Sequence, residues 1–180
     1  MSDTQYLAAK TIDEAVQAHN KANGSARFLA GGTDLLVQIK SGIKKPNLVI
    51  DVKKIVELNN IEEISENEFV VGASVSGANL NRNKKFSSLW PGVIEAFRLI
   101  GSEQIQGRAS LGGNLCNGSP AADGVPAMIA AGATCLVVGP KGSRTVAVEK
   151  IVGGPGKTSL KPGEFVVSFF LPSRGKNSGD

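Results

Sequence analysis

Two separated glycine pairs restrict the fold of this 180-residue chain more than any other feature of its sequence. The first lies in Ala-Gly-Gly-Thr-Asp-Leu at residues 30–35, and the second in Ala-Ser-Leu-Gly-Gly-Asn at residues 109–114. Because glycine has no Cβ, backbone N–H groups at such positions can approach an anion closely. Two loops of this kind could hold both phosphates of a pyrophosphate. The alternative is that each pair only forms a tight turn.

The first glycine pair lies inside a predicted strand–loop–helix–strand unit. Residues 27–30 and 47–52 predict short buried strands, and residues 35–40 predict a helical turn between them. A preceding helix over 12–22 is indicated by Thr11 and Glu14, whose spacing is that of a capping box. Such a strand–loop–helix–strand unit is the usual frame for a phosphate-binding loop.

After residue 60 the sequence predicts a β-hairpin, two helices and three further strands. Pro91 should begin the first helix and Gly101 should follow its end, whereas Asp123 should cap the second helix. The chain is therefore expected to be α+β, with a polar tail at its end. The expected strands cover 61–65, 68–73, 133–138, 145–149 and 164–171, and the expected helices cover 91–100 and 125–131.

Charge and composition argue against several kinds of binding protein. The net charge of +4 comes from basic residues that are scattered along the chain, and the small lysine clusters lack interleaved aromatic residues. We therefore expect no nucleic-acid binding. The longest uncharged stretch, residues 124–140, contains two prolines and is shorter than the ~20 apolar residues of a membrane helix. We expect no membrane span and a cytoplasmic location, since the N-terminus carries no secretory signal pattern.

The residues that could ligate a metal or act as a catalytic base are few. Cys116 and Cys135 are the only cysteines and His19 is the only histidine, so we expect no protein-ligated metal. His19 lies beside an apolar stripe of its predicted helix, which favours a packing or surface role over catalysis. The segment 153–158, Gly-Gly-Pro-Gly-Lys-Thr, imitates the end of a P-loop but has Ile151 where the first glycine belongs.

Six segments form a recognisable series when they are taken in order along the chain. They are Phe-Leu-Ala-Gly-Gly-Thr-Asp-Leu-Leu (28–36), Val-Gly-Ala (71–73), Ile-Gly-Ser-Glu-Gln-Ile (100–105), Arg-Ala-Ser-Leu-Gly-Gly-Asn-Leu (108–115), Ser-Pro-Ala-Ala-Asp (119–123) and Glu-Phe-Val-Val (164–167). Together they closely resemble the FAD-binding subunit of the molybdenum hydroxylases, the family of xanthine dehydrogenase and carbon monoxide dehydrogenase. The resemblance covers essentially the whole chain, and the combination of segments is far more specific than either glycine pair alone.

This resemblance implies a two-lobed FAD-binding fold of the carbon monoxide dehydrogenase flavoprotein type, similar also to vanillyl-alcohol oxidase-type domains. We expect an N-terminal α/β lobe over 1–58, a second α+β lobe over 59–172 with a mixed or antiparallel sheet, and a polar tail over 173–180. FAD would stretch between the lobes. The family continues with a C-terminal domain of roughly a hundred residues, which we expect to be missing after Asp180.

The resemblance also implies which residues bind FAD. The two glycine segments would wrap the pyrophosphate and ribityl region, and we expect the N–H groups of Gly31, Gly32, Gly112 and Gly113 to bind the phosphates. Asp123 would hydrogen-bond the cofactor, and Ile100 and Val167 would be apolar contacts of the flavin. The remaining implied FAD-binding residues are Leu29, Ala30, Thr33, Asp34, Leu35, Leu36, Ala109, Ser110, Leu111 and Asn114.

By the same resemblance, the expected function is electron transfer. Electrons would pass from a molybdenum-cofactor subunit through [2Fe–2S] clusters in another subunit to FAD, and then to NAD or another acceptor. No residue of this chain would be a catalytic acid or base, because the redox chemistry belongs to the cofactor. Two alternatives are a stand-alone flavin reductase of the cell-wall precursor type and a truncated flavin domain with a structural or interaction role.

Overall fold

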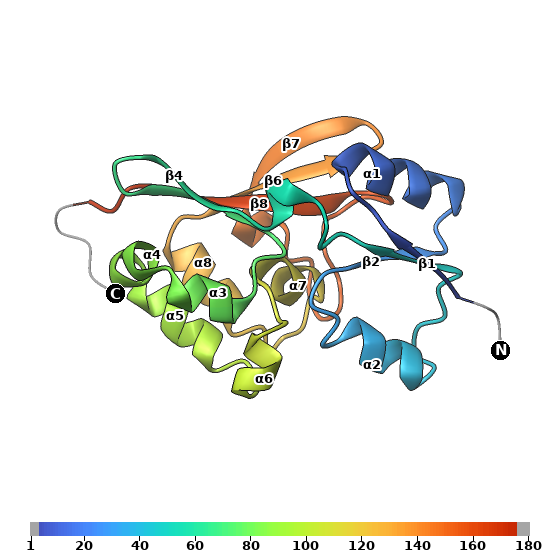
Figure 1. Ribbon diagram of the computed structural model, residues 1–180, viewed down its shortest axis with the longest axis horizontal. Helices are drawn as coiled ribbons and strands as arrows, with labels where there is room; N and C mark the ends of the chain where they lie inside the picture. The colour runs from blue at the N-terminus through green and yellow to red at the C-terminus, as the bar shows by residue number, and fades with distance from the viewer. Residues whose placement is uncertain (1–3, 176–180) are drawn as a thin grey trace.

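The computed structural model describes residues 4–175, which form two β-sheets with helices packed around them (Figure 1). The smaller sheet has three parallel strands in the order β1-β3-β2. Helix α1 connects β1 to β2 and helix α2 connects β2 to β3, which are the crossover connections that parallel strands of one sheet require. The elements are β1 (Gln5–Ala8), α1 (Ile12–Lys21), β2 (Ala26–Leu29), α2 (Leu35–Lys40) and β3 (Leu48–Asp51).

The larger sheet has five antiparallel strands in the order β4-β5-β8-β6-β7, so the last strand of the chain lies at its centre. Helices α3–α8 gather below this sheet in the view of Figure 1. The strands are β4 (Ile61–Ser65), β5 (Glu68–Gly72), β6 (Thr134–Gly139), β7 (Gly142–Ala147) and β8 (Phe165–Leu171). The helices are α3 (Gly77–Arg82), α4 (Lys84–Leu89), α5 (Pro91–Arg98), α6 (Glu103–Gln106), α7 (Leu111–Cys116) and α8 (Gly124–Ala130), and η1 (Val56–Leu58) and η2 (Val148–Lys150) are 3₁₀ turns.

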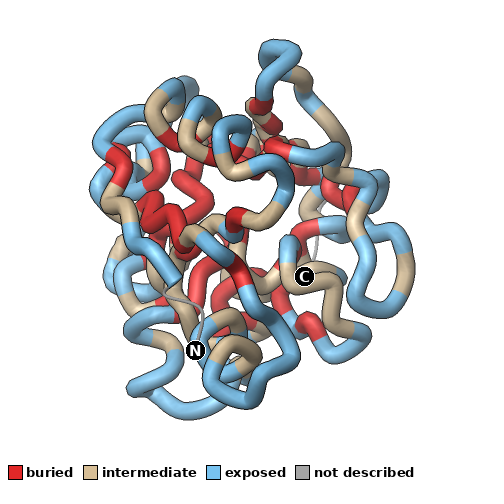
Figure 2. Tube along the Cα trace, turned by 90° about the vertical axis from the view of Figure 1, so that its right-hand side faces the viewer, coloured by how far each residue is buried: buried red, intermediate tan, exposed pale blue. Residues whose placement is uncertain are grey.

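Strand β8 contributes to both hydrophobic cores of the molecule. Val166, Phe169 and Leu171 pack into the core between the larger sheet and its helices. Phe165 and Val167 pack into the second core, which β8 shares with α1 and the smaller sheet. Buried segments accordingly run through the middle of the molecule in Figure 2. A strand covered on both faces reads as a continuous apolar run, which explains the sequence of residues 165–171.

Helix α1 confirms the predicted helix but corrects its cap. The hydroxyl of Thr11 accepts a hydrogen bond from the N–H of Glu14 at 3.1 Å, as expected. The Glu14 carboxylate, however, accepts from the N–H of Lys10 at 2.7 Å, one residue further back than a capping box requires. His19 is a packing residue, because it is buried and its ring stacks on that of Phe28 with centroids 5.0 Å apart. Burial lowers the pKa of His19, and the nearby Arg27 charge lowers it further.

A charged network secures the end of β3. Asp51 is buried, and its carboxylate accepts hydrogen bonds from the Tyr6 hydroxyl at 2.5 Å and from the Lys53 ammonium at 2.7 Å. Burial alone would raise the pKa of this carboxyl group. The hydrogen bonds from Lys53 and Tyr6 outweigh that effect and lower the pKa below its ordinary value of 3.8. Because Tyr6 belongs to β1, this network ties β1 to β3.

The second glycine segment is the main correction to the predicted secondary structure. It is not a loop, because Leu111–Cys116 form helix α7, and the hydroxyl of Ser110 caps that helix by accepting from the N–H of Gly113 at 3.1 Å. Asp123 was expected to cap the next helix, but α8 begins at Gly124 and the Asp123 side chain makes no capping bond. Instead, the Asn114 side-chain oxygen accepts from the Gly124 N–H at 3.1 Å.

Strand β1 and helices α3, α4 and α6 were also not predicted, whereas the other strands and helices α1, α2, α5 and α8 were. The expected lobe boundary after residue 58 falls between η1 and β4 and stays a prediction. The expected tail lies partly outside the described residues, since only 173–175 of it are described. No helix within residues 4–175 is long and apolar enough to cross a membrane.

Candidate functional site

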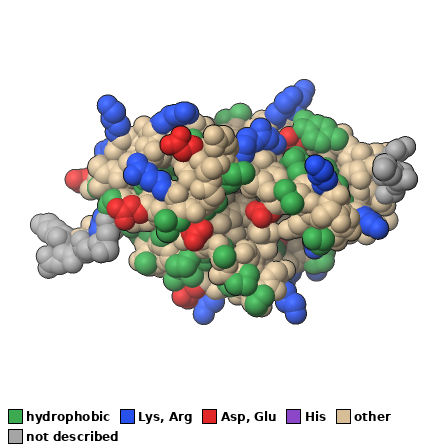
Figure 3. All heavy atoms as spheres, turned by 90° about the horizontal axis from the view of Figure 1, so that it is seen from below, with side chains coloured by type: hydrophobic (Ala, Val, Ile, Leu, Met, Phe, Trp, Pro, Cys, Tyr) green, Lys and Arg blue, Asp and Glu red, His purple; other side chains and the backbone are tan. Residues whose placement is uncertain are grey.

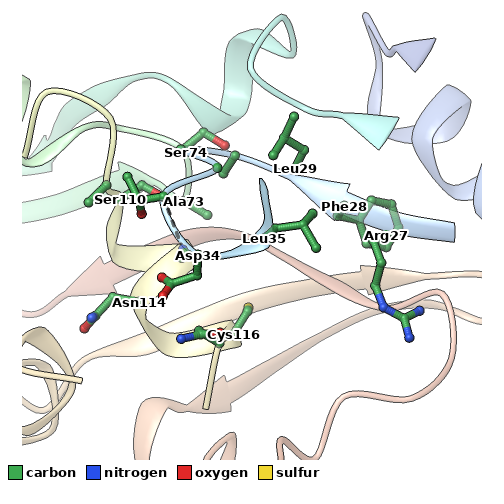
Figure 4. Close-up of a pocket in the computed structure, with 18 of the residues that line it drawn as sticks. Arg27, Phe28, Leu29, Asp34, Leu35, Ala73, Ser74, Ser110, Asn114 and Cys116 are labelled. Carbon is green, nitrogen blue, oxygen red and sulfur yellow. Dashed lines mark hydrogen bonds between the residues drawn. The ribbon is translucent and has the colours of Figure 1, made fainter. Parts of the chain in front are cut away.

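A cavity of about 430 Å³ lies where the first glycine segment meets the first turns of α7. In the close-up of Figure 4, Ser110 and Asn114 lie to one side of Asp34, and Phe28 and Arg27 lie to the other. The cavity therefore collects residues from the small-sheet unit and from the helices below the larger sheet. Thirteen predicted site residues line it: Leu29, Ala30, Gly31, Gly32, Thr33, Asp34, Leu35, Ile100, Ala109, Ser110, Gly112, Gly113 and Asn114.

The first glycine segment leaves the carboxyl end of β2 and presents free backbone donors at the cavity. Gly32 has a φ of +81°, a conformation that glycine adopts without strain. Gly31 lies so close to Arg108 that a Cβ built on it would be 2.1 Å from the Arg108 carbonyl oxygen. Within residues 4–175, no protein acceptor receives a hydrogen bond from the N–H groups of residues 31–34. These four groups are therefore available to an anion.

The second glycine segment differs, because its N–H groups are already engaged. The N–H of Gly112 donates to the Ala73 carbonyl at 3.0 Å, and that of Gly113 donates to the Ser110 hydroxyl. A Cβ on Gly112 would lie 2.6 Å from the Ala73 oxygen, so glycine here permits close packing of α7 against the end of β5. Of the four glycines, only Gly31 and Gly32 therefore have N–H groups without a protein acceptor among residues 4–175, and phosphate binding by all four stays a prediction.

Four predicted site residues do not line the cavity. Leu36 is about half exposed on α2, and Asp123 is exposed beside α8. Leu111 and Val167 are 3% and 2% exposed and belong to the two hydrophobic cores. The structure thus brings together Ile100 and most residues of both glycine segments, and leaves these four side chains outside.

Several residues of the cavity wall were missed by the sequence analysis. Phe28 and Phe165 pack against each other with ring centroids 4.5 Å apart, although 137 positions separate them. The spacing of residues along the chain carries no signal for such a pair. The other lining residues that were not predicted are Arg27, Gln38, Ile43, Lys44, Val52, Leu58, Ala73, Ser74, Cys116, Asn117, Gly156 and Val166.

Two uncommon polar groups belong to this wall. The Ser74 side chain is 7% exposed, and no hydrogen-bond partner for its hydroxyl exists among residues 4–175. Cys116 keeps an exposed surface, yet the protein atoms around its sulfur raise the pKa of the thiol to about 12 by desolvation. Desolvation therefore disfavours the thiolate, which is the nucleophilic form of this group. No cluster of metal-ligating side chains occurs in the described part of the chain.

The family follows from a comparison with known proteins. A family model described as the FAD binding domain in molybdopterin dehydrogenase matches residues 2–174. This chain belongs to that family. The resemblance drawn from the six sequence segments is confirmed, and FAD is the cofactor of the family.

Individual relatives agree with this assignment. The chain is 33% identical over 157 residues to the nicotinate dehydrogenase FAD-subunit of Eubacterium barkeri, covering 87% of this chain and 53% of that protein. It is 31% identical over 175 residues to the carbon monoxide dehydrogenase medium chain of Hydrogenophaga pseudoflava, covering 97% of this chain and 61% of that protein. This chain therefore spans between half and two thirds of the length of these relatives.

Solved structures confirm the α+β fold class and its likeness to the carbon monoxide dehydrogenase flavoprotein. A carbon monoxide dehydrogenase structure from Hydrogenophaga pseudoflava superposes with a TM-score of 0.91 at 31% identity, covering 96% of this chain and 60% of that chain. Quinoline 2-oxidoreductase from Pseudomonas putida 86 gives a TM-score of 0.89 at 25% identity, covering 94% and 59%.

The cavity wall fits the cofactor of this family. Four free N–H groups at residues 31–34 suit an anionic pyrophosphate, and the close backbone contact at Gly31 leaves no room for a side chain. The Ser74 hydroxyl, which has no hydrogen-bond partner among residues 4–175, is also free to bond a polar group of a ligand there. Phe28, Phe165 and Ile100 supply apolar wall for the neutral parts of a dinucleotide.

Proposed function

We propose that this chain binds FAD as part of an electron-transfer subunit in a molybdenum-containing hydroxylase or dehydrogenase. The observation that carries the proposal is the row of free N–H groups at residues 31–34, lining a cavity in a chain of this family. Bound FAD supplies the ability to accept and release electrons. The residues of this chain bind and orient the cofactor and keep water from part of its surface.

Charge at the cavity favours an anionic ligand. Arg27 and Lys44 contribute two cations to the lining, against the single carboxylate of Asp34. The phosphates of FAD would lie at the free N–H groups of the first glycine segment, where each charge-assisted hydrogen bond is worth about 1.5–3 kcal/mol. All seventeen residues predicted from the resemblance remain candidates for this binding. The thirteen that line the cavity have the geometric support that Leu36, Leu111, Asp123 and Val167 lack.

The partners also belong to this proposal. A [2Fe–2S] subunit, itself supplied with electrons by a molybdenum-cofactor subunit, would reduce the flavin, and NAD or another acceptor would oxidise it. Support comes from relatives described as a FAD-subunit and a medium chain, names that belong to multi-subunit dehydrogenases. Apolar side chains on the surface of the α2 region fit a partner contact, since Val37 and Ile43 are 63% and 72% exposed. The cytoplasmic location remains part of the proposal.

Two measurements test this function. The purified chain, after reconstitution with FAD, should show a flavin absorption spectrum, and acid should release FAD rather than FMN. Tagged in its native host, the protein should co-purify with iron, molybdenum and two further polypeptides. Recovery of FMN alone, or no affinity for FAD, would overturn cofactor binding and favour a structural module. A flavin-loaded chain that oxidises a substrate without partners would favour a stand-alone reductase.

A further inference from the structure

The segment that carries the free N–H groups is weakly attached to the rest of the fold. None of residues 30–45 is buried, and helix α2 within it has no buried residue. Leu36, Val37 and Ile43 point apolar surface to solvent instead of into a core. Apart from Ala30 at its start, which packs against the core of the smaller sheet, burial in a core does not fix where this segment lies.

Two side-chain hydrogen bonds connect residues 30–45 to the unit that begins at residue 59. The guanidinium Nε of Arg108 donates to the Gly31 carbonyl at 3.3 Å. The Gln38 amide Nε2 donates to the Asn117 side-chain oxygen at 3.2 Å. No other hydrogen bond or ion pair among residues 4–175 makes this connection. One bond holds the segment at its glycine pair, and the other holds it at its middle, on α2.

Asn117 is a firm attachment point. It forms the C-cap of α7, and that helix is fixed at its other end by the Ser110 cap and the bond from Gly112 to Ala73. The N–H of Asn117 also donates to the Gly113 carbonyl at 3.0 Å. Gln38, by contrast, lies on a six-residue helix that has no buried residue and is too short to be stable by itself. The bond between the two side chains therefore places α2 relative to α7.

We propose that Gln38 and Asn117 are positioning residues for FAD, acting as a clasp that holds residues 31–34 where their N–H groups meet the phosphates. This inference rests on the proposed FAD binding. When the clasp opens, α2 moves away from α7 and the donors leave the cavity. FAD then binds only the closed fraction of molecules, and its apparent affinity falls in proportion to that fraction.

The expected size of the effect follows from one neutral hydrogen bond. Such a bond contributes a net 0.5–1.5 kcal/mol, which corresponds to about a 2- to 13-fold change in an equilibrium constant. Gln38→Ala and Asn117→Ala should each weaken FAD binding by up to this factor. Because both substitutions break the same hydrogen bond, the FAD affinity of the double variant should be no lower than that of the single variant with the lower affinity.

The experiment is a double-mutant cycle on the full chain, with FAD affinity measured by flavin titration of the apoprotein. Hydrogen exchange of the FAD-free variants gives a second, independent readout, since opening of the clasp should speed exchange of the amides in residues 35–40. Gln17→Ala and Asn20→Ala are matched controls, because both remove the same groups from exposed positions on α1, away from the cavity. Neither control should change FAD affinity or the exchange of α2.

The outcomes separate the clasp from the proposed function. Non-additive losses of affinity together with faster exchange in α2 support the clasp. Unchanged FAD affinity in the variants overturns the clasp. It is also overturned if the affinity losses of the two single variants multiply in the double variant while hydrogen exchange in α2 stays normal. That result would mean that the two side-chain amides contact FAD directly. A wild-type chain that does not bind FAD refutes the proposed function, whereas the exchange data from the FAD-free variants still decide whether the clasp exists.

Discussion

Replacing Gly31 with alanine tests the geometry of the proposed phosphate site most directly. Gly31 has no positive φ, so an alanine there meets no backbone strain of its own. The difficulty is steric, because the new Cβ would lie 2.1 Å from the Arg108 carbonyl oxygen and 2.7 Å from its carbon. Both atoms belong to the backbone and cannot rotate away.

The size of the disturbance can be worked out from these contacts. Carbon and oxygen atoms in close contact are separated by about 3.3 Å, so the glycine segment must move by roughly 1.2 Å. A hydrogen bond stretched by that amount is lost. Losing one charge-assisted bond, about 1.5–3 kcal/mol, weakens FAD binding roughly 10- to 150-fold. The same overpacking should lower the free energy of unfolding by about 1–3 kcal/mol.

Gly24→Ala is the matched control. Gly24 has a φ of +82°, and a Cβ there would contact nothing within 4 Å. Its substitution should lower the free energy of unfolding by about 1–2 kcal/mol through backbone strain, with FAD affinity unchanged. Urea denaturation and flavin titration of both variants provide the comparison. A folded Gly31→Ala variant with wild-type FAD affinity would refute the assignment of phosphate binding to this segment.

Three further predictions concern the FAD-free protein, each measured by urea denaturation. Ser74→Ala should leave the free energy of unfolding unchanged or raise it, because the buried hydroxyl has no hydrogen-bond partner to lose. As a control, Ser25→Ala removes a hydrogen bond to the Ala22 carbonyl and should lower the free energy of unfolding by about 1 kcal/mol. Asp51→Asn should lower the free energy of unfolding at pH 7, and the difference from wild type should shrink below about pH 4. The folded state lowers the pKa of Asp51, so the stabilisation by this carboxylate disappears as pH falls through that pKa. A difference in free energy of unfolding that does not depend on pH would contradict this. Phe169→Ala should cost about 3–5 kcal/mol, and a loss below 1 kcal/mol would show that the core collapses around it.

The elements that the sequence predicted correctly are those with a local signal. Thr11 marked the start of α1, Pro91 that of α5, and the apolar run at 165–171 marked β8. Strand β1 carries no such signal, because its four residues are partly exposed and become a strand only by pairing with β3. Helix α7 was mistaken for a loop because glycine disfavours helix, although the cap residue Ser110 was a usable sign.

The candidate site was predicted in outline but not in detail. The glycine pairs indicated which segments meet, yet their chemical roles differ, because only tertiary contacts decide which N–H groups remain free. The N–H group of Gly112 already donates to the Ala73 carbonyl, and that of Gly113 donates to the Ser110 hydroxyl. Likewise, Phe165 reaches the cavity through the position of β8, which no local pattern reveals.

The central position of β8 also sets an order of events during synthesis of the protein. The β4–β5 hairpin leaves the ribosome early, but its neighbour β8 begins roughly 90 residues later, a delay of about 5–18 s at 5–20 residues per second. The core of the smaller sheet also cannot form before β8 is synthesised, because Phe165 and Val167 are part of that core. Neither sheet can close its core while the chain is still growing through α3–α8. Cofactor loading must therefore follow translation of nearly the whole domain, and the unfinished chain exposes its apolar strands until then.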